Sequence, residues 1–458
     1  MLSGLQFLRD RFSAFGDRPA LIWQDLPWSY EWMLAALDQW REHIADRKIP
    51  RGSIVSLTAE FSPSSTVALL ALIEHECIVV PLTSASAQKR DEFLEISRAS
   101  VNIALQPDDT ALVTNLAGGD PYPLYRQVRS DGHPGLVLFS SGSSGRSKAV
   151  LHDAHRLIDK FKTLRQAKRT IAFLSFDHIG GVNTLLHVLS NGGTVVTVPE
   201  RSPARVCQAI EQHRVQVLPT SPTFLNLLLM SDAPSRFNLS SLDTITYGTE
   251  VMPEGTLARL REKFPNATLL QTYGLSEVGI LRSKSESSDS LWVKVGGEGV
   301  ETRIVNGLLE IKSHSAMLGY LNAPSPFTSD GWFMTGDVVE ERDGFLRIHG
   351  RQSDIINVGG EKVFPAEVED VLQRLDGVTD AVVFGEPNAI VGHIVVAKVN
   401  LSTGETAPEF RKRMVQFCRQ HLQAYKVPQR VVLSADPLHS GRFKRIRREE
   451  AMTGESVG

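Results

Sequence analysis

Short apolar runs alternate with helical patterns through the first 350 residues, and this alternation constrains the fold more than any other feature of the sequence. Residues 54–57 are typical of a buried strand, residues 64–75 of a helix and residues 78–82 of the next strand. Further strands are predicted at residues 136–139, 171–174, 194–198, 215–218 and 244–247. Strands that alternate with helices favour parallel sheets covered by helices, so we predict an α/β fold.

The pattern changes towards the C-terminus. Residues 308–348 contain short strands and turns, which predict antiparallel pairing in a β-rich subdomain. A second unit is predicted after residue 350, with a helix at 365–375, strands at 381–384 and 394–399, a helix at 407–422 and a basic tail. We therefore expect a large N-terminal domain, residues 1–350, and a small α+β C-terminal domain, residues 351–458.

The balance of charges argues against some partners. Lys and Arg number 49 and Asp and Glu number 52, which gives a net charge of −3 with His neutral. A nearly neutral chain has no global electrostatic attraction to nucleic acid or to an anionic membrane. The longest uninterrupted apolar run, residues 67–73, is far shorter than the ~20 residues that cross a bilayer. We therefore expect neither a nucleic-acid partner nor a membrane span.

The N-terminus and the cysteines indicate a reducing compartment. Apolar residues recur at helical spacing between residues 5 and 15 with charged residues among them, which predicts an amphipathic helix rather than a signal peptide. The three cysteines, Cys77, Cys207 and Cys418, are far apart and lack metal or redox spacing. We expect them to be small hydrophobic residues in a cytoplasmic protein.

The most informative segment for chemistry runs from residue 139 to 148 and reads FSSGSSGRSK. Glycines let backbone N–H groups close around phosphate oxygens, hydroxyls add hydrogen bonds, and the lysine adds positive charge. The spacing differs from that of a P-loop, and a flexible linker is the alternative to a phosphate loop. The predicted nucleotide-binding residues are Ser140, Ser141, Gly142, Ser143, Ser144 and Gly145, with Lys148 as a catalytic charge.

This segment resembles the phosphate loop of the adenylate-forming superfamily, which includes acyl- and aryl-CoA synthetases, carrier-protein adenylation domains and luciferases. Other segments match in the same order: Tyr273 to Glu277, Thr335 to Asp337, Gly350 to Asp354 with Gly359 to Lys362, and Ser440 to Arg447. One departure is Ser147, where the family has proline, and this loss is expected to loosen the loop slightly. The resemblance implies activation of a carboxylic acid by ATP as an acyl-adenylate, with release of pyrophosphate.

The resemblance also implies roles for the matching residues. Adenylation brings two anions together, so it requires positive charge and a metal ion. Glu277 is expected to hold Mg²⁺, because Mg²⁺ prefers carboxylate and phosphate oxygens. Asp337 and Arg351 are expected to bind the ribose, and Tyr273 to offer its ring to adenine, although a lone tyrosine in a strand is more often a core residue. The remaining nucleotide-binding candidates are Gly248, Thr249, Glu250, Gly274 and Ser276.

The catalytic lysine near the C-terminus has two possible alignments. One places Arg442 after Ser440-Gly441, and the other counts from Ser440 to Lys444 and Arg447. The second keeps a lysine, whose ammonium acts as a point charge between acyl oxygen and α-phosphate. It also places Phe443 where the family has glycine. We favour Lys444.

The acid and its acceptor are less constrained. His178, at the expected start of the acid-pocket helix, and Phe224 are predicted to line a pocket for a carboxylic acid with an uncharged tail. An alternative has Asp177 binding the ammonium group of an amino acid, and His178 could simply start a helix. Gly359 and Gly360 are expected to line a tunnel for the thiol after the small domain turns about Ser353 or Asp354.

Coenzyme A is the favoured acceptor of the acyl group. The alternatives are an acyl carrier protein, an amine or another nucleophile, and outside catalysis a nucleotide-binding scaffold. The expected cofactors and co-substrates are therefore ATP, Mg²⁺ and coenzyme A, and the enzyme class is an AMP-forming acid–thiol ligase.

Overall fold

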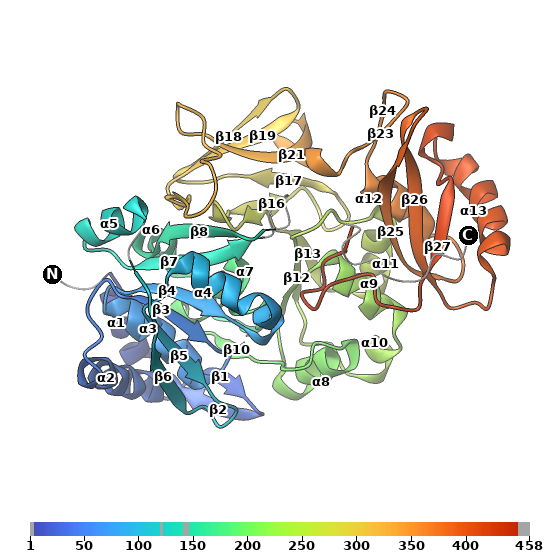
Figure 1. Ribbon diagram of the computed structural model, residues 1–458. Coiled ribbons are helices and arrows are strands. Elements are labelled where there is room, and N and C mark those ends of the chain that lie inside the picture. Colours follow the sequence, from blue (N-terminus) through green and yellow to red (C-terminus); the bar gives the residue numbers. More distant parts are fainter. Residues whose placement is uncertain (1–3, 120–121, 141–145, 448–458) are drawn as a thin grey trace.

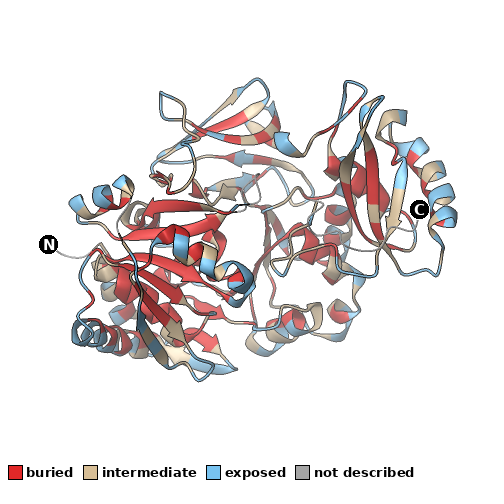
Figure 2. Cartoon of the chain, in the orientation of Figure 1, coloured by how far each residue is buried: buried red, intermediate tan, exposed pale blue. Residues whose placement is uncertain are grey.

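The computed structural model describes residues 4–119, 122–140 and 146–447. It has the predicted α/β architecture: two mixed sheets covered by helices, a β-rich subdomain and a small α+β unit at the C-terminus (Figure 1). The buried residues lie mainly along the strands and on the inner faces of the helices (Figure 2). The phosphate-loop residues Ser141, Gly142, Ser143, Ser144 and Gly145 lie outside the described residues.

The first seven-stranded sheet has the order β20-β8-β7-β4-β3-β5-β6. Its strands are β3 (Ile54–Thr58), β4 (Ile78–Leu82), β5 (Val101–Leu105), β6 (Ala111–Asn115), β7 (Gly135–Ser140), β8 (Lys148–Asp153) and β20 (Gly319–Tyr320). Strands β3, β4, β5 and β7 pair in parallel, as predicted, whereas β6, β8 and β20 add antiparallel edges. Its helices are α3 (Pro63–Glu74), α4 (Arg90–Ser97), α5 (Pro123–Ser130) and α6 (Ala154–Asp159).

The second seven-stranded sheet has the order β13-β12-β11-β9-β10-β1-β2. Its strands are β1 (Pro19–Trp23), β2 (Leu26–Ser29), β9 (Arg169–Ile171), β10 (Thr194–Val196), β11 (Val217–Thr220), β12 (Thr244–Tyr247) and β13 (Thr268–Gln271). All pairs are parallel except the β1–β2 hairpin. The accompanying helices are α1 (Gln6–Phe15), α2 (Tyr30–Asp46), α7 (Ile179–Ser190), α8 (Pro203–His213), α9 (Pro222–Met230), α10 (Ala233–Arg236) and α11 (Glu254–Lys263).

The β-rich subdomain is the antiparallel sheet β16-β17-β22-β21-β19-β18. Its strands are β16 (Ser283–Ser285), β17 (Trp292–Val295), β18 (Val300–Val305), β19 (Leu308–Ser313), β21 (Phe333–Arg342) and β22 (Phe345–Arg351). A short hairpin of β14 (Gly274–Leu275) and β15 (Gly279–Ile280) precedes it.

The small unit is a second α+β assembly, with strands in the order β24-β23-β26-β25 and β27 beside β26. Its elements are β23 (Ile356–Val358), β24 (Glu361–Val363), α12 (Pro365–Gln373), β25 (Val378–Asn388), β26 (Gly392–Leu401), α13 (Ala407–His421) and β27 (Arg430–Leu433). The 3₁₀ turn Gln352–Asp354 connects it to β22.

Local sequence explains why these elements form. Helix α3 begins at a Ser62 capping box with Pro63 in its first turn, where proline is favoured. Strand β4 is buried at every residue, as expected of a parallel strand covered on both faces. Helix α13 buries Phe410, Met414 and Cys418, which recur at the spacing of one helix face.

Three predicted strands of the second sheet have other bounds than expected. Strand β10 ends at Val196 instead of Val198, and β11 runs from Val217 to Thr220 instead of from 215 to 218. Strand β9 begins at Arg169, and instead of continuing to Leu174 it ends at Ile171. The Ala172 N–H still donates to the Val196 carbonyl at 2.9 Å, and after it the chain turns towards α7, where the Ser175 carbonyl accepts a hydrogen bond from the His178 N–H at 3.0 Å. The apolar run therefore continues into a buried turn, which periodicity cannot separate from a strand.

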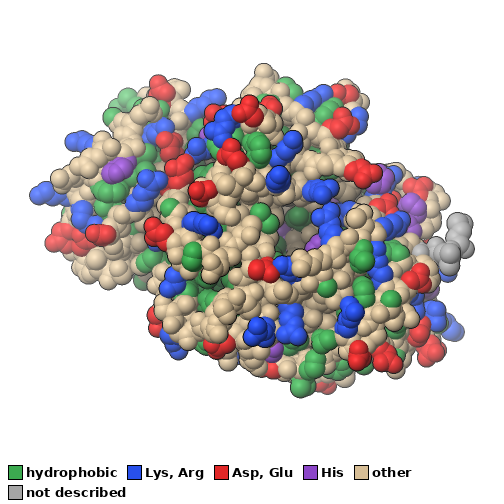
Figure 3. Space-filling model, turned by 180° about the vertical axis from the view of Figure 1, so that it is seen from behind, with side chains coloured by type: hydrophobic (Ala, Val, Ile, Leu, Met, Phe, Trp, Pro, Cys, Tyr) green, Lys and Arg blue, Asp and Glu red, His purple; other side chains and the backbone are tan. Residues whose placement is uncertain are grey.

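The small unit packs against the large one, and the C-terminal segment returns across the boundary. The Gly255 N–H donates to Asp370 Oδ1 at 2.9 Å, which joins α11 to α12. The segment after β27, red in Figure 1, runs back to the region of α9 and β12. On the reverse face the surface is hollowed near its centre, and Lys and Arg side chains gather beside the hollow (Figure 3). In the described part of the chain, no helix combines the length and the apolarity needed to cross a membrane.

Candidate active site

Glu277 lies in the turn between β14 and β15 and is fixed from several sides. Its Oε1 accepts a hydrogen bond from the Tyr320 hydroxyl at 2.8 Å and a longer one from Ser140 Oγ at 3.4 Å. Its own carbonyl accepts from the Met317 N–H at 2.7 Å. These contacts leave the other carboxylate oxygen, Oε2, without a hydrogen bond from any described residue. The turn therefore presents one oriented carboxylate beside the end of β7.

His152 holds the turn between β14 and β15 through a hydrogen bond to its backbone. It is fully buried, and its Nε2 donates to the carbonyl of Ser276 at 2.6 Å. Burial lowers the pKa of His152 to about 4, although its hydrogen bonds to backbone carbonyls oppose the shift. The imidazole is therefore neutral at pH 7, and it fixes the residue before Glu277.

This buried histidine predicts a pH-dependent stability. Between about pH 6.5 and pH 4 the unfolded chain takes up a proton at this position that the folded chain does not. The free energy of unfolding should therefore fall by about 3 kcal/mol across that window, and the effect should vanish above pH 6.5. Urea unfolding at a series of pH values measures this, with His152→Gln as the non-titrating control. Parallel curves for the wild type and the variant would contradict the assignment.

Lys148 and Ser147 follow the phosphate loop. Lys148 begins β8, and its Nζ lies 5.1 Å from the centre of the Tyr320 ring. The Ser147 N–H donates to Glu92 Oε1 at 2.9 Å, and its carbonyl accepts from Asn322 Nδ2 at 2.8 Å. A proline could not donate the first of these bonds. The hydrogen bond from the Ser147 N–H to Glu92 therefore offsets the loosening of the loop that the loss of proline is expected to cause.

Tyr273, Asp337 and Arg351 form a hydrogen-bonded group in which Tyr273 and Asp337 are buried and Arg351 is exposed. The Tyr273 hydroxyl donates to Asp337 Oδ2, and Arg351 Nε lies 2.8 Å from Asp337 Oδ1. Burial raises the pKa of Asp337, while Arg351 and the tyrosine hydroxyl lower it. Strands β21 and β22 place Asp337 opposite Arg351 in register. Tyr273 is only 5% exposed and packs in the β-rich core, so its ring is mostly committed to packing.

The segment after β12 approaches its neighbours closely. A side chain on Gly248 would lie 2.6 Å from Thr272 Oγ1, so only glycine fits there. Thr249 has a φ of +71°. Glu250 Oε2 accepts from Thr223 Oγ1 at 2.6 Å, and Oε1 accepts from the Arg445 N–H at 2.7 Å. Gly274 is similarly enclosed, because an added Cβ would lie 2.7 Å from the Gly279 carbonyl oxygen.

The C-terminal segment brings Lys444 to this site from the small unit. Loss of water around its amine lowers the pKa of Lys444, and so do the charges of Arg442 and Arg351, whereas Glu250 and Glu277 raise it. Among the described residues its Nζ has no hydrogen-bond or ion-pair partner. The competing residue Arg442 points elsewhere, since its Nη2 lies 2.6 Å from Asp177 Oδ2. Of the two candidate cations, Arg442 is therefore held by an ion pair, whereas Lys444 has no such partner among the described residues.

The predicted acid-pocket residues lie next to this segment. His178 is the N-cap of α7, where its Nδ1 accepts from the Gly180 N–H at 3.0 Å. Burial lowers the pKa of His178, and the charges of Lys444 and Arg442 lower it further, so the ring is neutral. Phe224, on α9, is fully buried and lies 5.3 Å from the Phe443 ring, centre to centre.

The structure does not bring Gly359 and Gly360 to the other candidates. They form the exposed turn between β23 and β24, with φ values of +60° and +94°, and no described residue would meet an added Cβ there. A substitution at either position is strained by the backbone alone, so it would not isolate a role in binding. The possible pivot, Ser353 with Asp354, lies in the 3₁₀ turn that joins the two units.

Sequence patterns missed several residues that shape the site. Tyr320 and Asn322, on or just after the short strand β20, orient Glu277 and the segment around Ser147. Glu369 on α12 is fully buried between Arg445 and Arg447. Burial would raise the pKa of Glu369, but the two guanidinium groups lower it to about 2. The only signal for Glu369 in the sequence was its position on the apolar face of a predicted helix.

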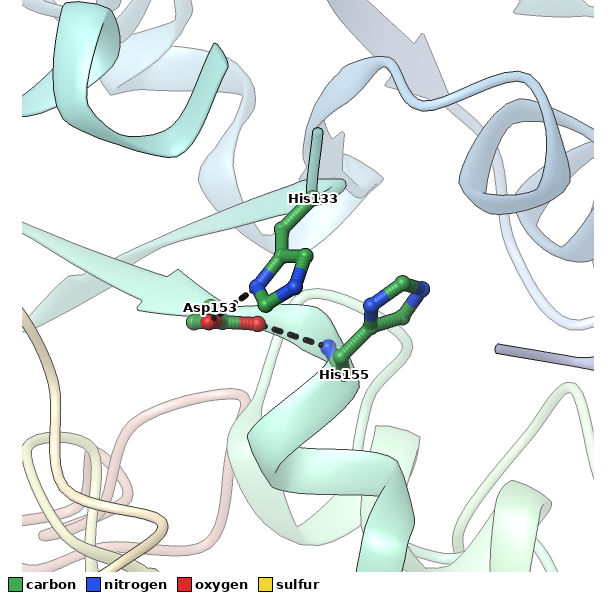
Figure 4. Close-up of side chains that lie close together, drawn as sticks. All are labelled: His133, Asp153 and His155. Atoms are coloured by element: carbon green, nitrogen blue, oxygen red, sulfur yellow. Dashed lines mark hydrogen bonds and ion pairs between the residues drawn. The ribbon is translucent and has the colours of Figure 1, made fainter. Parts of the chain in front are cut away.

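A second polar cluster lies away from these residues, where His133, Asp153 and His155 approach one another (Figure 4). Asp153 caps α6: its Oδ1 accepts from the His155 and Arg156 N–H groups, and Oδ2 accepts from His133 Nδ1 at 2.7 Å. Arg156 Nε also lies 3.3 Å from Oδ2. Because the carboxylate is occupied by these four donors, we interpret the cluster as a helix cap.

The sequence matches two family profiles in chain order. Residues 8–321 match the profile described as AMP-binding enzyme, and residues 367–440 match the profile of the AMP-binding enzyme C-terminal domain. The first match covers the two seven-stranded sheets and part of the β-rich subdomain, and the second covers most of the small unit.

Named relatives and a solved structure agree with these matches. A 3-[(3aS,4S,7aS)-7a-methyl-1,5-dioxo-octahydro-1H-inden-4-yl]propanoyl:CoA ligase of Rhodococcus jostii is 32% identical over 339 residues, which span 69% of this chain and 64% of the relative. The chain thus aligns with less than two thirds of that relative. A 2-succinylbenzoate–CoA ligase of Enterococcus faecalis is 25% identical over 457 residues, 91% of each chain. The anthranilate CoA ligase AuaEII, solved with anthranoyl-AMP, shares the fold, with a TM-score of 0.81, 18% identity and coverage of 97% of this chain and 95% of that one.

Proposed function

Because the chain belongs to the AMP-binding enzyme family, we propose that it is an AMP-forming acid–thiol ligase that activates a carboxylic acid with ATP and transfers the acyl group to coenzyme A. One observation carries the proposal most directly. Lys444 lies on a segment of the small unit whose next residue, Arg445, donates its N–H to Glu250 of the large unit at 2.7 Å, and the charges of Glu250 and Glu277 raise the pKa of the Lys444 amine. Such an amine is available for an anionic substrate.

In the first step a carboxylate oxygen of the acid attacks the α-phosphorus of ATP, and pyrophosphate leaves. Negative charge accumulates where the two anions meet, so fixed positive charge at that point lowers the barrier. We assign this role to Lys444 and to Lys148 at the end of the phosphate loop. Asp337 and Arg351 would hold the ribose hydroxyls, because their paired side chains retain acceptor and donor capacity.

The donor set around Glu277 fits Mg²⁺. The ion favours one or two carboxylate oxygens together with phosphate oxygens and water, and Glu277 Oε2 accepts no hydrogen bond from a described residue. Ser140 Oγ lies 3.4 Å from the same carboxylate. Mg²⁺ bound there would neutralise phosphate charge. The Tyr320 hydroxyl would orient Glu277 towards the ion, because it donates a hydrogen bond to Glu277 Oε1 at 2.8 Å.

In the second step the thiol sulfur attacks the acyl carbon, the acyl–oxygen bond breaks, and AMP leaves. We propose that the small unit first turns about Ser353 or Asp354, which withdraws Lys444 and brings the Gly359–Gly360 turn to the acceptor. The exposed position of that turn supports this, since no described residue occupies the space above it. Transfer to a carrier protein or an amine would use the same first step.

The acid we propose carries an uncharged aromatic or aliphatic tail. Phe224 on α9 and the neutral His178 at the start of α7 lie beside the lysine segment and support such a tail. A cytoplasmic location is supported by the cysteines, which are free and buried at all three positions. Burial raises the pKa of Cys77 to about 12, in keeping with a packing role.

ATP–pyrophosphate exchange across a panel of carboxylic acids tests the proposal. We expect exchange that requires Mg²⁺ and one class of acid with an apolar tail, and the same acid should give a thioester when coenzyme A is added. Holo-carrier protein and simple amines serve as the competing acceptors. A folded protein that supports no exchange with any acid would contradict the proposed activity, and thioester formation on a carrier protein alone would change the acceptor.

A further inference from the structure

The segment from Ser440 to Arg447 makes two separate sets of contacts, one to each unit of the protein. On the side of the small unit, Arg445 and Arg447 pair with the fully buried carboxylate of Glu369. Arg447 Nη2 lies 2.7 Å from Glu369 Oε2. These ion pairs join the segment to α12, so they move with the small unit whatever its orientation.

On the side of the large unit, Arg442 contacts a buried acid. Asp177 is only 4% exposed, and its Oδ2 accepts from Arg442 Nη2 at 2.6 Å and from Thr83 Oγ1 at 3.0 Å. Its Oδ1 is buried and has no hydrogen-bond partner among the described residues. Removal of Arg442 would therefore leave a buried charge with one hydroxyl as its remaining partner, which is unfavourable.

Phe443 contacts the same unit through its ring and its backbone. The ring centre lies 5.4 Å from that of Phe173 and 5.3 Å from that of Phe224. The Phe443 carbonyl accepts from Ser221 Oγ at 2.8 Å. Phe443 has a φ of +54°, which is unfavourable for a residue with a Cβ, so the packing of the ring must offset this strain.

We propose that Arg442 and Phe443 are positioning residues that form a latch, and that this latch holds Lys444 in the adenylating arrangement. The latch consists of the Arg442–Asp177 ion pair and of the packing of Phe443 on Phe173 and Phe224. This inference rests on the proposed function for its consequence in catalysis. Phe443 directly precedes Lys444, and Arg442 lies two residues before it, so docking these residues fixes the backbone that carries the amine. When the small unit turns, the latch must open while the Glu369 pairs persist.

The position of the small unit can be measured without a substrate. Spin labels at Arg205 on α8 and Lys412 on α13, both exposed, report the distance between the two units in the full-length protein. We expect one dominant docked distance in the wild type and a loss of that population by about fivefold in Arg442→Ala and in Phe443→Ala. Ile446→Ala removes an exposed side chain of the same segment and should leave the distribution unchanged.

A matched pair of variants separates the ring from the backbone. Phe443→Gly removes the ring but suits a positive φ, whereas Phe443→Ala removes the ring and keeps the strain. Both should lose the docked population if the ring is part of the latch. A docked population retained in Phe443→Gly, or distances in Arg442→Ala equal to those of the wild type, would overturn the latch.

Half-reaction kinetics give the second test. Arg442→Ala and Phe443→Ala should slow acyl-adenylate formation by about tenfold while thiolysis of preformed acyl-adenylate stays within about twofold of the wild type. Equal slowing of both half-reactions would indicate a general structural role and overturn the proposal. If the wild type forms no acyl-adenylate with any acid, the proposed function fails, whereas the distance measurement still decides on the latch.

Discussion

Replacing Lys444 with alanine is expected to slow acyl-adenylate formation by about 10²-fold or more, which is the scale of a charge contact made in the transition state. Loss of water lowers the pKa of the Lys444 amine, while the charges of Glu250 and Glu277 raise it, so its charge acts with little screening. Thiolysis of preformed acyl-adenylate should be nearly unchanged, because the second step takes place after the lysine has withdrawn. Single-turnover assays of each half-reaction measure the two effects separately.

Arg442→Ala is the matched comparison for this prediction. The two cations are two residues apart in one segment, but only Arg442 pairs with Asp177. Lys444→Ala should therefore give the larger loss of adenylation while keeping the docked distance between the units. If Arg442→Ala gave the 10²-fold loss and Lys444→Ala did not, the choice of lysine would be wrong.

The second large effect is expected at Glu277. Glu277→Gln keeps the size of the side chain and a hydrogen bond with Tyr320 but removes the negative charge that Mg²⁺ prefers. We expect pyrophosphate release to fall by about 10²-fold and to lose its dependence on Mg²⁺ concentration. Initial rates over a range of Mg²⁺ concentrations, with circular dichroism to check folding, measure this.

Glu298→Gln is the control for the loss of one carboxylate, because Glu298 is exposed in a loop of the β-rich subdomain. It should behave as the wild type does. Unchanged pyrophosphate release by Glu277→Gln at saturating ATP and Mg²⁺ would remove Glu277 from the metal site.

The sequence predicted those parts of the fold that depend on local pattern. Strands β4 and β12 begin and end at the predicted residues: β4 is an unbroken apolar run, IVVPL, and β12 alternates in burial along TITY. Strand β9 is shorter than predicted because a buried turn and a buried strand have the same apolar composition. The β1–β2 hairpin and the antiparallel edge at β6 pair segments that are neighbours in the chain, but periodicity within a segment does not encode which strand it pairs with or in which direction.

The candidate site was predictable to the extent that its residues carry motifs. Glu277, Asp337 and Arg351 were assigned from the resemblance of their segments to those of the adenylate-forming superfamily, and the structure brings Asp337 and Arg351 into contact through the register of β21 and β22. The Arg442–Asp177 pair joins residues 265 positions apart, and no local signal indicates it. The positive φ of Phe443 depends on the tertiary contacts of its ring, so the sequence revealed only that glycine was absent.

Transfer of heavy oxygen from the acid to AMP tests the central claim most directly. When the enzyme converts an acid whose carboxylate oxygens are both heavy, in the presence of ATP, Mg²⁺ and coenzyme A, the attacking oxygen should remain on the α-phosphate after the thiol displaces it. Mass spectrometry of the products should therefore find one heavy oxygen in AMP and none in pyrophosphate. Heavy oxygen in inorganic phosphate together with ADP, or turnover with unlabelled AMP, would contradict the acyl-adenylate mechanism.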